Sequence, residues 1–526
     1  NSKLIEEVKE TLPLFYDYSS NTNIMFTIGM PLVVNEMLFN CAVTFYQGQI
    51  AAITPKSYPP KYKEFYELRH FAKARESIKD FIVTSRENVT VPFGTNIIII
   101  HPEYRDFKLH VEICEDGWVP ISPSTNAALM GATVLANLSA SNFTIGKNKY
   151  RKDLFTVASG KNIAAQMYSS CGYGESTSDI VFDGHALIAE RGTLLTESIR
   201  FQIDSSHIIT DIDLESIKRD RMTQNSFREN SSDFGKDIKI VPDLKVSDKE
   251  FEHPNHINPY KKLMRVVEQK PFVPSNKDSR DERCEEIFMI QSLALAKRLE
   301  SLPKDNRQII IGVSGGQDST HALNVAVNTV DLLKMARNSI IAITMPGFGT
   351  TSKTKNNAIE LCKRYGVTLF EIPINNICEE IWKEIGHNKN VTDLVFENSQ
   401  AWTRKFIELT MAIKFKGIVL GTGDLSELML GWCTMFGDHA SHYNVNCSVP
   451  KTLISDLILW KAFHSEKNLS DCLKSILNTK ISPELLPAIN DEISQDTEEN
   501  VGPYDLNDFF SYYFIRFGFS PLKIYR

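Results

Sequence analysis

The chain has 526 residues, too many for one hydrophobic core, so two or three domains are expected. A hydrophobic content of 42%, a charged content of 23% and a net charge of −7 are typical of a globular enzyme and argue against a nucleic-acid-binding protein. No apolar run is long enough to span a membrane, and the nine cysteines are scattered without metal-ligand spacing. We therefore expect a cytoplasmic protein that contacts neither membrane nor nucleic acid.

The two ends of the chain look cut. The sequence begins with Asn1 rather than Met, and it stops at Arg526, directly after an aromatic-rich apolar stretch. We interpret the chain as a fragment of a longer protein.

Residues 1–215 contain short apolar segments between polar turns and little long helix, a pattern that predicts a strand-rich domain. The expected strands cover residues 24–30, 40–46, 96–100, 107–113, 132–138, 163–168, 180–182 and 186–189. A polar segment over residues 216–280, rich in Ser, Asp, Lys and Pro, is expected to be a connector.

From residue 281 the pattern changes to alternating strands and helices, which predicts a parallel, doubly wound sheet with ligands at the carboxyl ends of its strands. The expected strands are 309–313, 340–345 and 367–371, and the expected helices are 284–299, 320–336 and 353–365.

Cys114 ends the expected strand in the segment Lys-Leu-His-Val-Glu-Ile-Cys-Glu-Asp-Gly-Trp. A cysteine at such a turn is a candidate nucleophile, although a lone cysteine is more often a buried structural residue. Two companions favour the nucleophile: Lys56, in a segment with aromatic and acidic neighbours, and Ser141, at the end of the next strand. A nearby ammonium lowers the pKa of a thiol.

The apolar run 309–313 breaks at Ser314-Gly315-Gly316, and a helical pattern begins near Ser319. A strand, a glycine turn and a helix N-terminus together make an anion site, and the glycines let the backbone approach a phosphate. The carboxylate of Asp318 suits Mg²⁺ above that phosphate. The loop lacks the Gly-Lys-Ser/Thr of a Walker A motif. An ordinary turn with polar capping residues is the alternative interpretation.

Three further segments follow expected strands or open helices in the second half. They are residues 345–354, residues 396–404 and residues 421–454. Lys451 is a candidate for stabilising charge on phosphates, with a solvated surface lysine as the alternative. Glu427 is a candidate metal ligand, with a helix-cap partner as the alternative.

The loop Ser-Gly-Gly-Gln-Asp-Ser resembles the pyrophosphate loop of ATP pyrophosphatases, and residues 281–526 as a whole resemble NAD synthetases. That family activates the nicotinate carboxylate of deamido-NAD as an adenylate, and ammonia then displaces AMP. Trp402 departs from the pattern, because some members have an arginine there. By matched positions the resemblance implies ATP at Ser314, Gly315, Gly316, Asp318, Ser319, Met345, Arg404 and Thr422, deamido-NAD at Asn398, Trp402, Asp438 and Lys451, and Mg²⁺ at Asp318 and Glu427.

The first half resembles the nitrilase superfamily, which has a Glu-Lys-Cys triad in an α-β-β-α sandwich, and within it the glutaminase domain of glutamine-dependent NAD synthetases. The resemblance implies that Cys114 attacks the glutamine amide and that Lys56 stabilises the oxyanion and the thiolate. It also implies that glutamine is held by Tyr62, Glu115, Ser141 and Lys147, the last of these standing where related enzymes often have an arginine.

The triad glutamate has no counterpart upstream of Lys56. Pro483-Glu484-Leu485 is interpreted as a decoy, because it lies in the synthetase half, and Glu67 is expected to support the site from a different position. Either the glutamate lies in residues that precede Asn1, or the glutaminase is impaired.

The resemblance therefore predicts an N-terminal α-β-β-α amidase domain (1–215), a connector (216–280) and a C-terminal ATP-pyrophosphatase domain (281–526), in a homo-oligomer paired through the synthetase domain. The expected activity converts deamido-NAD, ATP and glutamine into NAD, AMP, pyrophosphate and glutamate. The alternatives are an ammonia-only synthetase with an impaired glutaminase, a non-catalytic homologue, and another ATP-pyrophosphatase amidotransferase such as a GMP or asparagine synthetase. That last class pairs the loop with different glutaminases.

Overall fold

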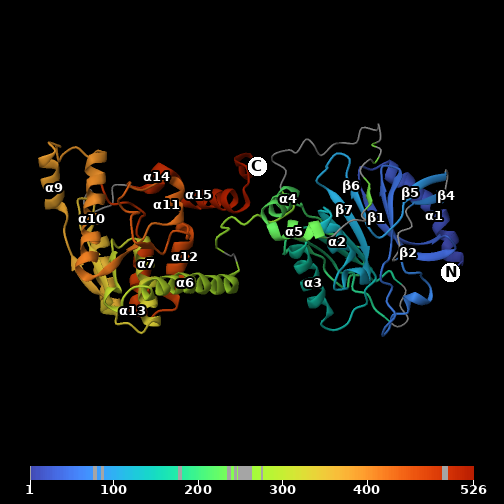
Figure 1. Ribbon diagram of the computed structural model, residues 1–526, viewed down its shortest axis with the longest axis horizontal. Coiled ribbons are helices and arrows are strands. Elements are labelled where there is room, and N and C mark those ends of the chain that lie inside the picture. Colours follow the sequence, from blue (N-terminus) through green and yellow to red (C-terminus); the bar gives the residue numbers. More distant parts are fainter. Residues whose placement is uncertain are drawn as a thin grey trace. The chain divides into compact units, whose positions relative to one another are not determined.

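The computed structural model describes residues 2–74, 80–84, 88–175, 180–233, 239–241, 244, 246, 263–273, 276–487 and 496–525. The chain folds into two compact units, Asn1–Val267 and Glu268–Arg526, and each is described by itself (Figure 1). No helix in the described ranges has the length and hydropathy to cross a membrane.

The first unit contains two main sheets. One is antiparallel and has the order β1-β2-β3, formed by β1 (Phe26–Val34), β2 (Met37–Tyr46) and β3 (Gln49–Pro55). The other has seven strands in the order β11-β10-β9-β8-β7-β6-β12. Its strands are β6 (Ile97–Ile100), β7 (Lys108–Ile113), β8 (Val134–Ser139), β9 (Ala165–Ser170), β10 (Ala186–Glu190), β11 (Thr193–Glu197) and β12 (Lys239–Val241), and a separate hairpin joins β4 (Asp80–Thr84) to β5 (Asn88–Pro92).

The two sheets pack face to face between helices. A shared core joins Ala42 and Ala52 of the small sheet to Ile99 and Val111 of the large one. Helix α1 (Ser2–Ser20) covers the outer face of the small sheet, while α2 (Pro123–Leu129) and α3 (Lys147–Lys161) contact the large one. The expected α-β-β-α sandwich is thus observed. Helices α4 (Leu214–Thr223) and α5 (Asn225–Asp233) complete this unit.

Two long helices of this unit were not expected from the sequence, for different reasons. Helix α1 contains Pro13, which removes a backbone donor and argues against a helix interior. Helix α3 buries only Arg151, Phe155 and Ser159, one residue per turn, so its apolar stripe is too narrow to give a clear period. The segment 180–182, expected as a strand, is irregular.

The second unit has a five-stranded parallel sheet in the order β15-β14-β13-β16-β17. The strands are β13 (Gln308–Gly312), β14 (Ile340–Thr344), β15 (Thr368–Glu371), β16 (Gly417–Gly421) and β17 (Tyr443–Asn444). Side chains alternate between two cores: Ile309 and Ile311 belong to one, and Ile310 to the other. The predicted doubly wound parallel sheet is therefore observed.

Helices cover both faces of this sheet. The helices of this unit are α6 (Lys277–Glu300), α7 (Gln317–Leu332), α8 (Ser352–Tyr365), α9 (Asn375–Glu384), α10 (Leu394–Phe415), α11 (Leu425–Leu430), α12 (Lys451–Phe463), α13 (Lys467–Leu477), α14 (Thr497–Val501), α15 (Tyr504–Ser511) and α16 (Pro521–Tyr525), and residues of α6–α10, α12 and α13 belong to the two cores. The chain moves from β13 to β14 and β15 on one side, and returns to β16 on the other. This reversal creates the crevice in which such sheets bind ligands, at the carboxyl ends of β13 and β16.

Candidate functional sites

The phosphate-loop candidate begins where β13 ends. Gly315 has a φ of +86°, and a Cβ atom there would lie 2.2 Å from the carbonyl oxygen of Thr354, so both conformation and space require glycine. The N–H of Gly316 donates to the Ser314 hydroxyl at 3.2 Å, and helix α7 starts at the next residue. A sixteen-residue helix thus begins close to the end of a buried strand, and its N-terminus favours the binding of an anion.

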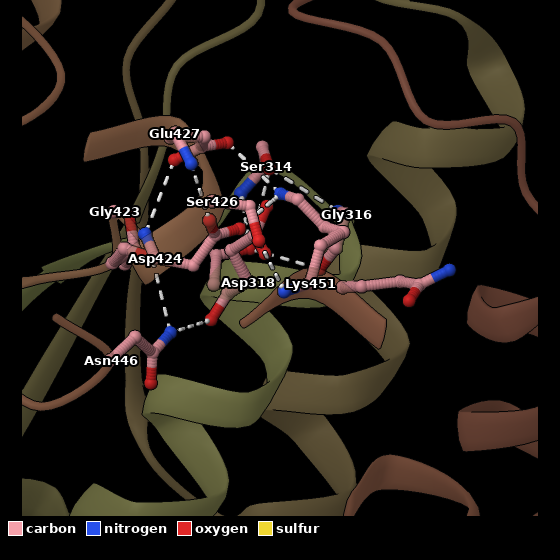
Figure 2. Close-up of polar contacts among 12 residues, drawn as sticks. Ser314, Gly316, Asp318, Gly423, Asp424, Ser426, Glu427, Asn446 and Lys451 are labelled. Atoms are coloured by element: carbon pink, nitrogen blue, oxygen red, sulfur yellow. Dashed lines mark hydrogen bonds and ion pairs between the residues drawn. The ribbon is translucent and has the colours of Figure 1, made fainter. Parts of the chain in front are cut away.

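Four side chains converge beside this loop, and we call them the acid–lysine cluster: Asp318, Asp424, Glu427 and Lys451 (Figure 2). The Nζ atom of Lys451 lies 2.7 Å from Asp318 Oδ2, 2.6 Å from Asp424 Oδ2 and 2.9 Å from Glu427 Oε1. The Lys451 side chain is only 2% exposed. The alternative of a solvated surface lysine is therefore wrong.

The electrostatics of the cluster follow from burial and from its excess of carboxylates. Burial lowers the pKa of Lys451, but the three carboxylates outweigh it and hold that pKa well above 10.5. Burial raises the pKa of Asp424, and the charge of Asp318 raises it further against the opposing effect of Lys451. Burial and Asp318 likewise raise the pKa of Glu427. The lysine is thus held charged, while the carboxylates compete for one cation.

Asp424 and Glu427 form a capping box at the start of α11. Asp424 Oδ1 accepts from the N–H of Glu427 at 2.8 Å, and the N–H of Asp424 donates to Glu427 Oε2 at 3.3 Å. The cap alternative for Glu427 is thus observed, while its other oxygen, Oε1, accepts from Lys451. The same carboxylate caps the N-terminus of α11 and contacts Lys451.

The side-chain amide of Asn446 ties the two strand ends of the site together. Its Nδ2 donates to the carbonyl oxygens of Asp318 and Thr422, at 3.0 and 3.1 Å. The sequence pattern placed Asp424 at the carboxyl end of an expected strand but gave it no ligand role, and it assigned no role to Asn446.

The cluster opens into a cavity of about 500 Å³ at the carboxyl ends of the strands. Two of the predicted positions, Gly315 and Trp402, are not part of its wall. The predicted residues that line it are Ser314, Gly316, Asp318, Ser319, Met345, Asn398, Arg404, Thr422, Glu427, Asp438 and Lys451.

Thr434 connects two of the predicted substrate residues on the cavity wall. Its hydroxyl donates to Asn398 Oδ1 at 2.9 Å, and its N–H donates to Asp438 Oδ1 at 2.8 Å. Trp402, also on α10, is exposed, and its indole N–H donates to the carbonyl oxygen of Met435 at 2.8 Å.

Glu484, from the Pro-Glu-Leu stretch interpreted as a decoy, lies in this second unit and lines the same cavity. The Thr354 hydroxyl donates to its Oε2 at 3.2 Å, and burial raises the pKa of Glu484 to about 7. Glu484 therefore belongs to the cavity of the second unit and not to the Cys114 site of the first.

The donor set of the acid–lysine cluster suits a hard divalent cation. Carboxylate oxygens of Asp318, Asp424 and Glu427 lie within 4.8 Å of one another. The buried Oδ1 atom of Asp318 has no hydrogen-bond partner. A buried carboxylate oxygen without a partner is what an oxygen-seeking ion such as Mg²⁺ would satisfy.

In the first unit, Cys114 stands at the end of β7 and begins the short 3₁₀ helix Cys114–Gly117. Its φ is +49°, which costs free energy for a residue with a Cβ atom. The cysteine is half-buried, as a reactive thiol must be to meet a substrate. The strand end thus presents a strained, accessible thiol.

Lys56 follows β3 and is buried, at 4% exposed. Its Nζ contacts Glu67 Oε2 at 2.5 Å, and the Asn40 amide donates to the other oxygen of Glu67 at 2.6 Å. Glu67 therefore holds the ammonium of Lys56 in place, as expected for a supporting residue.

Asp116 joins the lysine segment to the cysteine turn. It is buried and accepts from the N–H groups of Ser57 at 3.2 Å, Tyr58 at 2.8 Å and Ile113 at 3.2 Å. Ser57 directly follows Lys56, and Ile113 directly precedes Cys114. Sequence reasoning missed this residue, because an acidic residue beside a turn has no distinctive signature.

The predicted glutamine-binding residues surround this turn. The Tyr62 hydroxyl donates to both oxygens of Glu115, at 2.9 and 3.0 Å, and Ser141 is buried. Lys147 donates to Asn142 Oδ1 at 2.8 Å. Burial lowers the pKa of Lys147, Arg151 adds to that effect, and the proximity of Cys114 opposes it. Lys147 and Cys114 are thus electrostatic neighbours.

Two family models match the chain in sequence. A carbon-nitrogen hydrolase model matches residues 5–222, and an NAD synthase model matches residues 292–512. An amide-hydrolysing fold and an NAD-synthase fold on one chain define the class of glutamine-using nucleotide ligases.

Individual relatives narrow that class. The glutamine-dependent NAD(+) synthetase of Mycobacterium leprae is 40% identical over 529 residues, which cover 99% of this chain and 76% of that protein. The enzyme of the same name from Aquifex aeolicus is 24% identical, covering 99% of this chain and 81% of that protein. A solved structure of the Acinetobacter baumannii glutamine-dependent NAD+ synthetase, in complex with adenosine diphosphate, aligns with 20% identity and a TM-score of 0.36, over 99% of this chain and 80% of that chain. The chain belongs to the glutamine-dependent NAD(+) synthetase family.

Proposed function

We propose that this chain is a ligase that makes NAD from deamido-NAD with glutamine as the nitrogen donor and ATP as the activating substrate. The observation that carries the proposal is the presence of two sites on one chain: the strained Cys114 turn, joined through Asp116 to the segment of buried Lys56, and the acid–lysine cluster beside the phosphate loop. Glutamine, ATP and deamido-NAD are the substrates that this pairing requires, because the first site releases the ammonia that the second site consumes.

In the first site, Cys114 Sγ attacks the side-chain amide carbon of glutamine, and ammonia leaves. Water then hydrolyses the thioester to glutamate and restores the thiol. Lys56, held by Glu67, places a positive charge beside the sulfur and the developing oxyanion. Tyr62, Glu115, Ser141 and Lys147 bind the charged end of glutamine.

In the second site, a carboxylate oxygen of the nicotinate attacks the α-phosphorus of ATP, and pyrophosphate leaves. Ammonia then attacks the activated carbonyl carbon, and AMP leaves. Ser314, Gly315, Gly316 and Ser319 bind the phosphates through the loop and the N-terminus of α7. Lys451 stabilises the negative charge that develops on them.

The remaining cavity residues divide between the two substrates. Met345, Arg404 and Thr422 line the ATP side, and Asn398, Asp438, Lys451 and the more peripheral Trp402 serve deamido-NAD. Asp318 and Glu427, with Asp424, would hold Mg²⁺, which neutralises phosphate charge when bound.

The experiment that tests this function measures NAD, AMP and pyrophosphate formed from ATP and deamido-NAD, with either glutamine or ammonia. Product with both nitrogen sources supports the proposal. Product with ammonia alone indicates a synthetase with an impaired glutaminase. No product with either source, together with no binding of ATP and Mg²⁺, indicates a non-catalytic homologue.

A homo-oligomer and a cytoplasmic location complete the proposal. Helix α10 exposes a run of large apolar side chains, including Trp402, Phe406 (70% exposed) and Ile413 (81% exposed), which fits a covering second copy. We expect Phe406→Glu to lower the sedimentation coefficient relative to wild type, with the exposed polar Lys414→Glu as the control.

All nine cysteines are free, as in a reducing compartment.

A further inference from the structure

Helix α15, far from the phosphate loop in sequence, places one buried carboxylate behind the acid–lysine cluster. Asp508 is only 2% exposed and is not among the residues that line the cavity. Its two oxygens accept from residues of two other helices, α11 and α12, which carry Glu427 and Lys451. A buried carboxylate is stable only when hydrogen-bond donors compensate the loss of water, and these two helices supply the donors for Asp508.

The contacts form a closed network. The Ser426 hydroxyl donates to Asp508 Oδ1 at 2.5 Å, and the N–H of Lys451 donates to the Ser426 hydroxyl at 2.9 Å. On the other side, the N–H and hydroxyl of Thr452 donate to Asp508 Oδ2 at 3.0 and 2.7 Å. Ser426 directly precedes Glu427, and Thr452 directly follows Lys451.

The network also satisfies the start of α12. Pro450 stands at its N-cap and offers no side-chain hydrogen bond, so the first N–H groups of the helix need acceptors from elsewhere. Asp508 supplies one directly, and Ser426 supplies another. A carboxylate at a helix N-terminus is also favoured by the helix dipole. Tyr504 of the same helix α15 places its ring 5.5 Å from Lys451 Nζ.

We infer that Asp508 is a positioning residue of the adenylation site: it fixes Lys451 and Glu427 relative to each other by accepting hydrogen bonds from the N–H and hydroxyl of Thr452 and from the hydroxyl of Ser426. The inference rests on the proposed function of the acid–lysine cluster. It adds a residue that touches neither substrate and that belongs to the last helices of the chain.

The test compares Asp508→Asn with Asp505→Asn in the full-length chain. Both remove one carboxylate from α15, but Asp505 is more than half exposed and pairs with Lys270 at 3.1 Å on the surface. Asparagine at 508 keeps one acceptor and cannot serve all three donors. We expect Asp508→Asn to raise the KM for ATP and lower kcat with ammonia, by about 10- to 100-fold in kcat/KM. Asp505→Asn stays at the wild-type values.

Two readouts separate positioning from mere folding. A purely structural defect lowers the active fraction, so that kcat falls while the KM for ATP stays constant, and that result overturns the inference. Glutamine hydrolysis by Cys114, in the other unit, should keep its wild-type rate in Asp508→Asn. If Asp508→Asn does not fold, Thr452→Val removes one donor alone, and a smaller rise in the KM for ATP is then expected; no rise overturns the inference.

A double-mutant comparison tests whether Asp508 acts through Ser426. If Asp508 acts through Ser426, the loss in Asp508→Asn combined with Ser426→Ala is smaller than the product of the two single losses. Multiplicative losses would show independent action and overturn the inference. A wild-type protein without deamido-NAD-dependent pyrophosphate release would overturn the proposed function as well, whereas an active wild type with an unaltered Asp508→Asn overturns the positioning role alone.

Discussion

The Nζ atom of Lys451 and the Oδ2 atom of Asp424 lie 2.6 Å apart, and the side chain of Asp424 is completely buried. One ammonium thus faces three carboxylates, since Asp318 and Glu427 contact the same nitrogen. Burying that much charge costs free energy unless each group is paired. A bound cation would neutralise the excess negative charge of the three carboxylates, and an anionic substrate would interact with Lys451. The same carboxylates explain why Lys451 is held charged.

Replacing Lys451 tests whether its positive charge acts on the substrate phosphates. We expect Lys451→Met to lower kcat/KM of the ammonia-driven reaction by about 100-fold or more, because it removes charge stabilisation from the phosphates. The control is Lys461→Met, on the same helix but outside the cavity wall. Steady-state rates of pyrophosphate release measure both. Equal rates for Lys451→Met and wild type would contradict a role of Lys451 at the phosphates.

Replacing Cys114 tests the division of labour between the units. We expect Cys114→Ala to lose NAD formation from glutamine while keeping the ammonia-driven rate, because the adenylation site is untouched. Cys171→Ala is the matched control, since Cys171 is also half-buried and burial raises its pKa to about 12, which leaves it unreactive. Glutamine-driven synthesis that survives in Cys114→Ala would show that another group releases the ammonia.

Much of this arrangement was predictable from the sequence, because parallel strands bring their carboxyl ends together and the loops after β13 and β16 carry distinctive residues. The place of the Ser314-Gly315-Gly316 loop followed from that rule, whereas Lys451 was placed by its matched position in the NAD synthetase family. Asp116 and Asp508 could not be predicted. Each acts by accepting backbone N–H groups from distant segments, and no spacing in the sequence records such a contact. Helix α1 was missed because Pro13 argued against it.

Glu67 provides a separate test of the first site. Glu67→Gln leaves the buried ammonium of Lys56 without its carboxylate, so we expect a loss of about 10- to 100-fold in glutamine hydrolysis. The ammonia-driven rate should not change. Glu36→Gln, an exposed position in the turn after β1, is the control. A wild-type rate of glutamine hydrolysis in Glu67→Gln would mean that Lys56 is held by another group.

The buried Glu112 predicts a pH dependence of stability in the first unit. Burial, and then the charge of Asp116, raise the pKa of Glu112 from 4.5 to about 7. Because the folded-state pKa is the higher one, the folded protein holds the proton more tightly. This stabilisation is complete below the unfolded pKa and is lost as the pH rises through about 7. The rise of the Glu112 pKa from 4.5 to about 7, at about 1.4 kcal/mol per pH unit, corresponds to roughly 3 to 4 kcal/mol.

Glu112→Gln has no such titration, so its stability relative to wild type should increase by up to that amount as the pH rises from 4.5 to 7. Hydrogen exchange of peptides from β7 and β8, corrected for the intrinsic pH dependence of exchange, measures it in this unit. Glu36→Gln should track the wild type throughout. A difference between Glu112→Gln and wild type that does not vary with pH would show that Glu112 titrates normally.

The transfer of the glutamine amide nitrogen into NAD can be followed directly with an isotopic label. Wild-type protein is incubated with ATP, Mg²⁺, deamido-NAD and glutamine labelled isotopically at its side-chain amide nitrogen. We predict labelled NAD in equal amount to AMP and pyrophosphate, and no pyrophosphate when deamido-NAD is omitted. Undiminished pyrophosphate release without deamido-NAD would contradict it.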